Sequence, residues 1–216
     1  MDAATSQTEG RRERNKREKR DRIFAAAAEL FAERGFEDVT TQQIAERADV
    51  GAGTLFRYAA TKGELFLMVY NVRLAAAVHE GAAAAADETD VAAAICAMVR
   101  PSLEWALDLG DSADYQRELL FGPPDEEYRA EGLATVADLE ARIAARLEEA
   151  APPGANPADA RRAARSVFAV LNLLLVQPLN QLHPDLDAPH ELCAQVTQIV
   201  RGYLAAVGAT AGPGDA

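Results

Sequence analysis

The chain has 216 residues, a formal net charge of −12, a hydrophobic content of 49% and two cysteines. Abundant alanine and leucine with few strand-forming residues predict an all-α protein, long enough for one small and one larger helical domain. The sequence lacks the HExxH, GxSxG, P-loop and GxGxxG motifs, and its three histidines have no metal-ligand spacing. These features argue against an enzyme, and we predict no metal and no cofactor.

The charged N-terminus has no apolar segment, so we predict no signal peptide. The longest apolar run, Val167–Leu179, is too short for a membrane span and is interrupted by polar residues and a proline. Cys96 and Cys193 lie far apart in the sequence on apolar faces, which predicts buried free thiols rather than a disulfide framework. Together these features predict a cytoplasmic protein in a reducing compartment.

The first ten or so residues are predicted to be disordered, and a basic helix follows them. Between Gly10 and Arg22, eight Lys and Arg residues stand against three acidic ones. The helix should end at about Arg34, with Gly35 as the cap residue just beyond it. Its apolar stripe forms the predicted buried face: Ile23, Phe24, Ala27, Leu30 and Phe31. A basic run is usually a solvated surface, so its role depends on the segment that follows.

The segment Val39–Lys62 predicts two short helices joined by a tight turn. Thr40 can cap the first helix, and Gln43, three residues on, can complete a capping box. Gly51 stands at the cap of the second helix, whose Leu55 should point inward. The Gly-Ala-Gly-Thr start of that helix costs stability but lets the backbone approach a surface closely. This is the layout of a helix-turn-helix DNA reader. An ordinary core hairpin would more often carry Leu, Glu and Lys in its second helix.

Beside such a hairpin, the basic run is interpreted as an arm or helix end on phosphates, with Arg11, Arg12 and Arg14 as candidate contacts. The charge distribution agrees with this interpretation. Residues 1–62 hold 12 Lys and Arg against 11 Asp and Glu, whereas residues 63–216 hold 10 against 23. An acidic body should face away from DNA and disfavour wrong docking orientations.

These motifs together, over Arg22–Leu65, resemble the N-terminal domain of the TetR family of bacterial transcriptional regulators. The matching pieces are the AAxELFAERGFEDVT entry, the IAERADVGAGTLFRY core and the lysine at position 62. The rest of the chain is similar to the family only in length and helical character. In two places the sequence departs from the family. Gly51 replaces the usual Ser-like cap, and Ala59 replaces a bulky apolar anchor whose space we expect a neighbour such as Phe66 to fill.

The resemblance implies DNA contacts along the hairpin. It implies phosphate contacts for four residues: Thr41, Thr54, Tyr58 and Lys62. It implies base-facing positions for Gln42, whose amide can bond adenine, and for Ala52 and Gly53, which offer close approach or contact with a thymine methyl group. Phe56 stands where the family usually has Tyr and keeps the apolar contact, while Arg57 can reach phosphate or base. With few long polar groups on the hairpin, sequence choice should depend on Gln42, Arg57, the N-terminal arm and DNA shape.

After Lys62 the sequence predicts five or six helices, separated by glycine, proline and capping residues. Their expected ranges are Lys62–Glu80 with an alanine tract beyond it, Asp90–Leu109, Ser112–Phe121, Pro124 or Asp125 to Ala150, Pro157 to about Gln177, and Pro189–Val207. We therefore divide the chain into a disordered tail (1–10), a helix-turn-helix DNA-binding domain (11–62), a C-terminal helical effector-binding and dimerisation domain (63–208) and a second disordered tail (209–216).

The penultimate helix is apolar nearly all round, so it must be covered on more than one side. A two-fold four-helix bundle formed with the last helix, as in the family, would cover it; the alternative is a central helix in a monomeric bundle. The candidate dimer residues are Val167, Val170, Leu171, Leu174, Leu192, Val196, Ile199, Val200 and Tyr203.

The resemblance further implies a ligand cavity inside the C-terminal bundle. The candidate lining residues are aromatic or softly polar, and residues of each kind are more often ordinary core residues than ligand contacts: Met98, Trp105, Tyr115, Phe121, Tyr128, Phe168 and Asn172. Asn172 lies within an apolar run and needs a hydrogen-bond partner, which can be a ligand, the opposite subunit or a backbone carbonyl. This mixture suggests an unidentified, mainly apolar small molecule.

The resemblance thus implies a sequence-specific, DNA-binding transcriptional regulator that acts as a homodimeric repressor on a palindromic operator in double-stranded DNA. A small-molecule ligand would release it. Two alternatives stay open: a ligand-independent regulator or activator of the same fold, and a helical adaptor that does not bind DNA.

Overall fold

Helices make up most of this computed structural model, which describes residues 10–180, 183 and 185–210. The described residues contain no strand, so the all-α prediction is confirmed. In chain order the helices are α1 (Arg11–Arg34), α2 (Thr41–Arg47), α3 (Ala52–Leu55), α4 (Lys62–Ala84), α5 (Val91–Asp108), α6 (Ser112–Phe121), α7 (Glu127–Ala150), α8 (Pro157–Asn180) and α9 (Ala188–Thr210). None of the described helices combines the length and apolarity that a membrane span requires.

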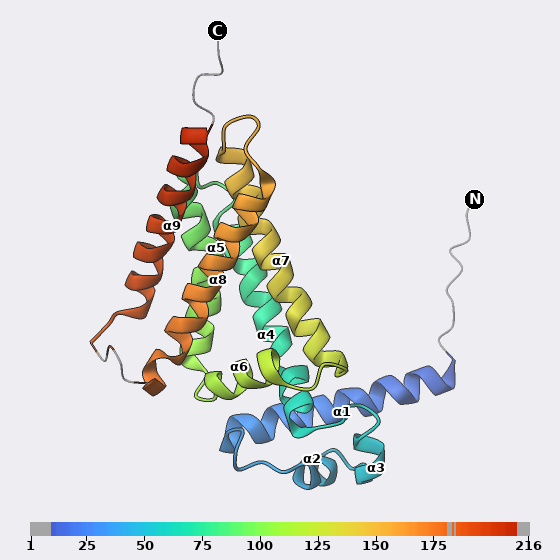
Figure 1. The fold of residues 1–216 in the computed structure, drawn as a ribbon. Helices are drawn as coiled ribbons and strands as arrows, with labels where there is room; N and C mark the ends of the chain where they lie inside the picture. Colours follow the sequence, from blue (N-terminus) through green and yellow to red (C-terminus); the bar gives the residue numbers. More distant parts are fainter. Residues whose placement is uncertain (1–9, 181–182, 184, 211–216) are drawn as a thin grey trace, which may run out of the picture.

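The first three helices lie together at one end of the molecule, and the long helices form a bundle above them (Figure 1). Helix α4 leads from this end into the bundle, where α5, α7, α8 and α9 run beside it or beside one another. The short helix α6 crosses the base of the bundle, next to α1. This arrangement places the α2–α3 hairpin at the far end of the molecule from the C-terminal end of α9.

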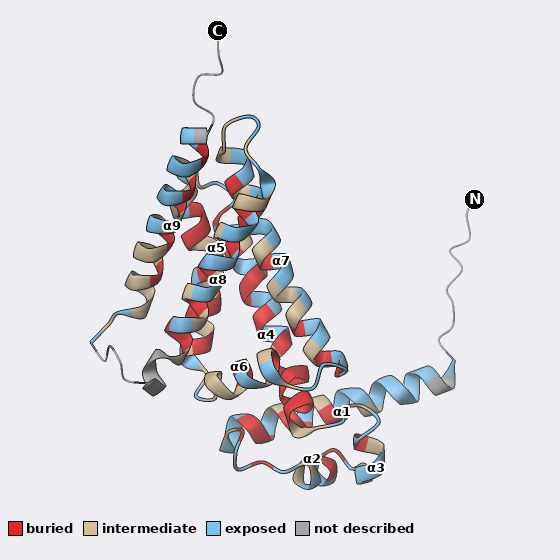
Figure 2. Cartoon of the chain, in the orientation of Figure 1, coloured by how far each residue is buried: buried red, intermediate tan, exposed pale blue. Residues whose placement is uncertain are grey.

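One apolar core runs from α1 to α9 (Figure 2). Phe66 of α4 is fully buried, and its ring centroid lies 4.9 Å from that of Phe31 and 4.7 Å from that of Phe36. Leu30 and Leu65 are buried in the same cluster. The N-terminal helices therefore pack on the start of α4 through large apolar side chains, which fixes the position of the hairpin against the bundle.

Most helix starts follow local capping residues. The side chains of Thr61 and Asp90 accept hydrogen bonds from the backbone at the starts of α4 and α5, and Asn156 does the same before α8. Helix α7 begins at Glu127, two or three residues later than predicted, because Glu126 is extended and accepts a hydrogen bond from Thr61 instead. Helix α9 extends to Thr210, beyond the predicted end; the tails at residues 1–9 and 211–216 lie outside the described residues.

The two cysteines are not free thiols. Cys96 of α5 and Cys193 of α9 form a disulfide, with their Cα atoms 5.3 Å apart. The sequence prediction was wrong because it judged the cysteines by their separation in the chain, whereas the packing of α5 against α9 brings them together.

Candidate nucleic-acid interface

The α2–α3 hairpin is held by a capping box and a tight turn. The Thr40 hydroxyl accepts a hydrogen bond from the Gln43 backbone N–H at 3.3 Å, and the Gln43 side chain accepts one from the Thr40 backbone N–H at 2.8 Å, as predicted. Asp49 adopts a left-handed backbone conformation at the turn (φ 52°), which Asp tolerates better than most residues. Gly51 then begins α3 without a side-chain cap.

Helix α3 presents a small outward face. It is only four residues long, and backbone hydrogen bonds continue the turn as far as Ala59. Leu55 is fully buried, so the prediction that it points inward is confirmed. On the outward side, four residues are exposed and two are half-buried: Ala52, Gly53, Phe56 and Arg57, then Thr54 and Tyr58. No neighbouring atom lies within 4 Å of the position that a Cβ on Gly53 would take, so a large surface can approach the backbone here.

Helix α2 adds a second outward edge to the hairpin. Thr41 is half-buried and Gln42 is exposed, with its amide donating to Glu46 in the next turn at 2.8 Å. On the opposite side, Arg47 pairs with Glu29 and Glu33 of α1 at 3.1 and 3.4 Å. Hydrogen bonds to Glu33 and Glu29 raise the pKa of Arg47. These ion pairs brace α2 against α1 and leave the Thr41–Gln42 edge facing solvent.

A cleft of about 350 Å³ opens between α1 and the turn that follows α3, lined by Asn15, Lys16, Lys19, Arg57 and Tyr58. The Tyr58 hydroxyl donates to the Lys16 carbonyl oxygen at 3.2 Å and ties this turn to α1. A tyrosine hydroxyl has one donor hydrogen, so a Tyr58–phosphate bond requires it to leave this carbonyl. The sequence analysis did not predict that Lys16 and Lys19 lie beside the hairpin. Their i,i+3 spacing, which puts both on one face of α1, could have indicated a shared cationic surface.

The ammonium group of Lys62 lies beneath the hairpin, against the loop between α1 and α2. It donates to the carbonyl oxygens of Phe36 at 2.9 Å and Glu37 at 3.3 Å, and lies 4.2 Å from the centroid of the Phe36 ring. Because an ammonium has three donors, at most one remains for DNA. The phosphate contact expected of Lys62 therefore stays a prediction, while the contacts that the structure gives it secure the start of α4.

The basic arm is the N-terminal part of α1. Arg14 is exposed, whereas the side chains of Arg11 and Arg12 lie outside the described residues. Because α1 is a continuous helix from Arg11 onward, its basic residues extend away from the hairpin as a helix end rather than as an extended arm (Figure 1).

Buried carboxylates join the hairpin to the bundle at the starts of α4 and α7. The Glu64 carboxylate accepts hydrogen bonds from the backbone N–H groups of Ala60 and Glu127, at 2.5 and 2.9 Å. The Thr61 hydroxyl donates to Glu126 at 2.7 Å. Burial raises the pKa of Glu126, against the lowering effect of the Thr61 hydrogen bond, and the neighbouring Glu64 raises it further. These hydrogen bonds link the start of α7 to the residues that follow α3.

A second junction is made by α6. Asp111, just before α6, accepts a hydrogen bond from the Phe36 backbone N–H at 2.7 Å. Arg117 of α6 lies 3.9 Å from Glu37 and within 5.6 Å of the Phe36 ring centroid. These contacts were not predicted, because they pair residues that are distant in sequence and have no local signature.

Most of the predicted ligand-binding residues pack in or against the apolar core. Tyr115 and Tyr128 are buried, Trp105 packs edge-on against Tyr115 with centroids 5.5 Å apart, and Asn172 donates to the carbonyl of Phe168 in its own helix at 2.9 Å. The partner of Asn172 is thus a backbone carbonyl, one of the three alternatives. Only Tyr115 and Tyr128 of the seven are buried; Met98, Trp105, Phe168 and Asn172 are half-buried, and Phe121 is 82% exposed at the end of α6.

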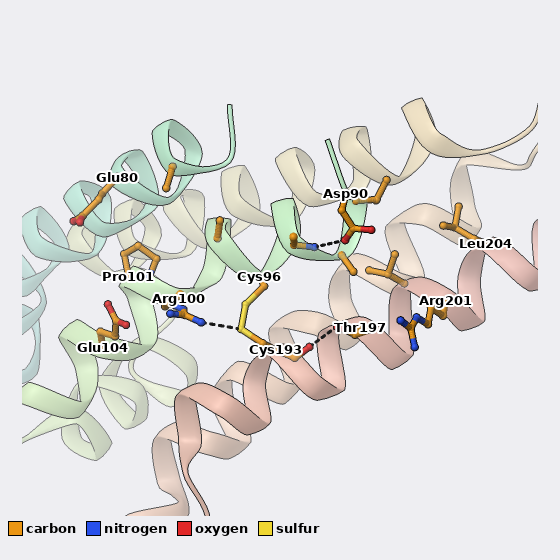
Figure 3. A pocket seen from close by; sticks show the side chains of 16 residues that line it. Glu80, Asp90, Cys96, Arg100, Pro101, Glu104, Cys193, Thr197, Arg201 and Leu204 are labelled. Atoms are coloured by element: carbon orange, nitrogen blue, oxygen red, sulfur yellow. Dashed lines mark hydrogen bonds between the residues drawn. A yellow bond between two sulfur atoms is a disulfide. The ribbon is translucent and has the colours of Figure 1, made fainter. Parts of the chain in front are cut away.

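A cavity of about 760 Å³ lies elsewhere, between α5 and α9 beside the end of α4 (Figure 3). None of the seven predicted ligand residues is among the sixteen that line it. Its lining includes the disulfide and five charged side chains: Glu80, Asp90, Arg100, Glu104 and Arg201. The sequence analysis did not predict this cavity because its lining residues come from more than one helix.

Seven of the nine predicted dimer residues are buried in the chain's own core, which corrects their assignment to a surface: Val167, Leu171, Leu174, Leu192, Val196, Val200 and Tyr203. They are covered by helices of the same chain, since α8 and α9 pack on each other and on α5 and α7. Val170 and Ile199 are half-buried. On the outward side of α8, Leu173 is 56% exposed and was not among the predicted interface residues.

Comparison with known proteins places the hairpin in a family. Residues 23–69 match the bacterial regulatory proteins of the tetR family. The HTH-type transcriptional regulator TcmR of Streptomyces glaucescens is 43% identical over 58 residues, which are 27% of this chain and 26% of TcmR. The HTH-type transcriptional repressor KstR of Mycolicibacterium smegmatis is 43% identical over 51 residues, 24% of this chain and 25% of KstR. The chain thus matches about a quarter of the length of these relatives.

Solved structures extend the similarity to the bundle. FadR of Thermus thermophilus, a TetR family transcriptional repressor solved in complex with lauroyl-CoA, superposes with a TM-score of 0.65 at 25% identity, over 84% of this chain and 93% of FadR. The TetR family regulator PfmR, also of Thermus thermophilus, superposes with a TM-score of 0.55 at 21% identity, over 84% of this chain and 98% of PfmR. The fold of the whole chain is therefore that of a helix-turn-helix domain followed by a helical C-terminal domain.

Proposed function

We propose that this chain, whose residues 23–69 match the tetR family of bacterial regulatory proteins, is a homodimeric repressor that binds a palindromic operator and leaves it when a small molecule occupies the bundle. The observation that carries the proposal is the exposed face of the α2–α3 hairpin, with three cationic side chains beside it on α1 and in the turn after α3. We keep residues 11–62 as the DNA-binding domain and 63–208 as the effector-binding and dimerisation domain.

The hairpin face supports insertion into a DNA groove. The small residues Ala52 and Gly53 allow the α3 backbone to approach base edges, and Gln42 can exchange its bond to Glu46 for an adenine. Thr41 and Thr54 flank this face with hydroxyl groups suited to phosphates. The cleft lined by Lys16, Lys19, Arg57 and Tyr58 then forms a cationic edge along one DNA strand.

The dimer is proposed on the outward faces of α8 and α9. A palindromic operator requires two hairpins related by a two-fold axis, about one helical turn of DNA apart. Because most of the predicted apolar residues are used inside the chain, the contact should depend on the residues that remain outward: Leu173 with Val170 on α8, and Ile199 on α9. A partner would remove the exposed Leu173 side chain from water, which favours association.

The effector is proposed to enter the cavity between α5 and α9. FadR of Thermus thermophilus was solved in complex with lauroyl-CoA, so a protein of this fold can bind an amphiphilic ligand. In this chain the cavity of about 760 Å³ has apolar side chains together with Arg100 and Arg201. Its lining of three carboxylates and two arginines favours an effector that carries polar groups over the wholly apolar molecule that aromatic candidates alone would suggest.

Helix α4 gives the effector a route to the hairpin. Glu80 and Ala84, near its C-terminal end, line the cavity, while Lys62 and Glu64, at its start, hold the loops around α3. An effector that shifts the end of α4 would therefore favour a conformer with a different separation between the two hairpins. The effector can shift this equilibrium by no more than the difference between its binding free energies to the two conformers.

The proposal is tested by selecting bound sequences from random DNA with the full-length protein. We expect a palindromic consensus, and binding to it should weaken steeply as salt is raised. Arg57→Ala should weaken binding and reduce the slope of log Kd against log salt by about one. The matched control is Arg142→Ala, which removes an exposed arginine paired with Asp138 on α7 and should leave both quantities unchanged. Failure to enrich any sequence would contradict the proposal.

A further inference from the structure

The Cys96–Cys193 disulfide lies in the wall of the cavity between α5 and α9 rather than in the closed core (Figure 3). Cys96 is buried, whereas Cys193 is half-buried, and both cysteines line the cavity. A small solute that enters the cavity can therefore reach the sulfur atoms. A disulfide that solvent can reach is open to chemical exchange, unlike one enclosed in apolar packing.

Arg100 supplies the electrostatic asymmetry between the two sulfurs. Its guanidinium donates to Cys193 Sγ at 3.4 Å, and it lies one helical turn after Cys96 on α5. Among the described residues, no carboxylate pairs with Arg100, although Glu104, Glu80 and Asp90 also line the cavity. A cation beside a sulfur favours the thiolate, which is the nucleophilic form of cysteine. Cys193 is thus the more reactive thiol of the two, and Cys96 is the neighbour that can form the disulfide with it.

The compartment in which such a regulator works favours a reversible disulfide over a structural one. This step rests on the proposed function, because a DNA-bound bacterial regulator works where thiols are kept reduced. In such compartments, disulfides are usually transient and catalytic or redox-sensing rather than structural. A bridge in the wall of a cavity, with a half-buried cysteine beside an arginine, matches the partly exposed position next to a cation in which redox-active cysteines occur.

We propose that Cys96 and Cys193 form a hydroperoxide-sensitive pair, in which Cys193 reacts first and Cys96 resolves it into the disulfide. In the reduced protein, the Cys193 thiolate attacks a peroxide oxygen. The O–O bond breaks, an S–O bond forms, and hydroxide or an alkoxide leaves. The Cys96 sulfur then attacks Cys193, the S–O bond breaks, and water leaves with the thiol proton. The two cysteines give up two electrons in total, and the hydroperoxide accepts them.

The bridge has a structural consequence for the cavity. It links α5 to α9, the two helices on either side of the cavity, and α5 packs along α4. In the oxidised protein this link fixes the distance between the cavity walls at one point. In the reduced protein the same walls are held by packing alone, so the redox state and the effector act on the same helices.

The test uses the full-length protein, reduced, desalted and treated with one equivalent of hydrogen peroxide. We expect both thiols to disappear, with a mass loss of about 2 Da per chain and a peptide that joins Cys96 to Cys193. In Cys96→Ser, the reaction should stop at a Cys193 sulfenic acid that dimedone traps. Arg100→Gln should slow the loss of thiols about tenfold at neutral pH. The matched control, Arg201→Gln, alters an arginine further along the same cavity and should react at the wild-type rate.

Three outcomes would overturn the proposal: thiols that persist, a bridge that forms only between chains, or an Arg100→Gln variant that reacts as fast as the wild type. The thiol measurements do not involve DNA. A protein that forms the bridge but selects no DNA sequence would therefore refute the proposed function alone, and a protein that selects an operator but leaves its thiols unreacted would refute the cysteine pair alone.

Discussion

At the scale of single residues, the two adjacent threonines at the start of α2 have different partners. Thr40 caps the helix through Gln43, whereas Thr41 faces the proposed DNA surface. Thr40→Ala should lower the free energy of unfolding by about 1 kcal/mol, the usual loss for a removed helix cap. Thr41→Ala should leave it unchanged within about 0.5 kcal/mol but weaken binding to the selected operator. Urea titration and fluorescence anisotropy measure the two effects, and a Thr41→Ala variant that binds normally would remove Thr41 from the interface.

Glu126 provides a second prediction at this scale, because its buried carboxyl group has a raised pKa in the folded protein. The folded state then holds a proton more tightly than the unfolded state, so the contribution of Glu126 to stability is greatest below its unfolded pKa and is lost as pH rises through the folded pKa. Glu126→Gln keeps an oxygen that can accept from Thr61 and removes the charge.

Relative to the wild type, Glu126→Gln should therefore become progressively more stable as the pH is raised from about 4 towards 8, with little difference at the acidic end. Urea titrations at several pH values measure this difference. Glu131→Gln, which changes an exposed glutamate of the same helix, is the control and should follow the wild type. A constant difference between Glu126→Gln and the wild type at all pH values would show that the carboxyl group does not titrate in this way.

At the scale of elements, α4 and α5 meet at a glycine. A Cβ on Gly81 would overlap the backbone carbonyl of Met98, which cannot move aside as a flexible side chain would. Gly81→Ala should therefore separate the two helices and lower the free energy of unfolding by about 1–3 kcal/mol, in spite of the better helix propensity of alanine. Gly208→Ala on α9, where no atom lies within 4 Å of the added Cβ, should be neutral or slightly stabilising. Equal stability of the two variants would contradict the close approach at Gly81.

The start of a helix could be predicted from the sequence where the residues that fix it lie close together in the chain. Thr40 and Asn156 act on backbone groups two or three residues away, so their helices began where the sequence indicated. Glu126 is held extended by Thr61, which is distant in sequence, so the start of α7 was misplaced. The inward direction of Leu55 followed from helical periodicity, whereas the proximity of Cys96 and Cys193 required the packing of two helices that sequence patterns do not encode.

For the candidate functional site too, one part could be predicted from the sequence and the other could not. The outward face of the hairpin was visible in the sequence because small and polar residues interrupt an apolar pattern at helical spacing. The cavity was not, because an aromatic residue such as Trp105 or Tyr115 has the same signature in a core as in a ligand site. The cavity depends instead on where α4, α5 and α9 leave a space, and its lining is largely small and charged.

At the scale of the whole molecule, the acidic bundle and the cationic edge of the hairpin lie in different parts of the structure. This separation orients a single chain on DNA but does not align two chains with each other. Two-fold alignment requires a surface on the bundle, and α8 has an exposed Leu173 on its outward side. The dimer and the DNA-binding mode are thus linked through a helix that is remote in sequence from the hairpin.

The matched substitutions Leu173→Glu and Val72→Glu test this link. Both replace exposed apolar helix residues, at 56% and 58% exposure, so neither should disturb the core of the chain. Leu173→Glu places a charge opposite its symmetry mate in the proposed interface, where leaving it unpaired is costly. It should shift the protein from dimer to monomer in sedimentation experiments and weaken binding to a full palindrome more than to a half-site. Val72→Glu, on α4, should remain dimeric. If both variants stay dimeric, the two-fold contact lies elsewhere on the bundle; if Leu173→Glu is monomeric yet binds the palindrome normally, DNA recognition does not require the dimer.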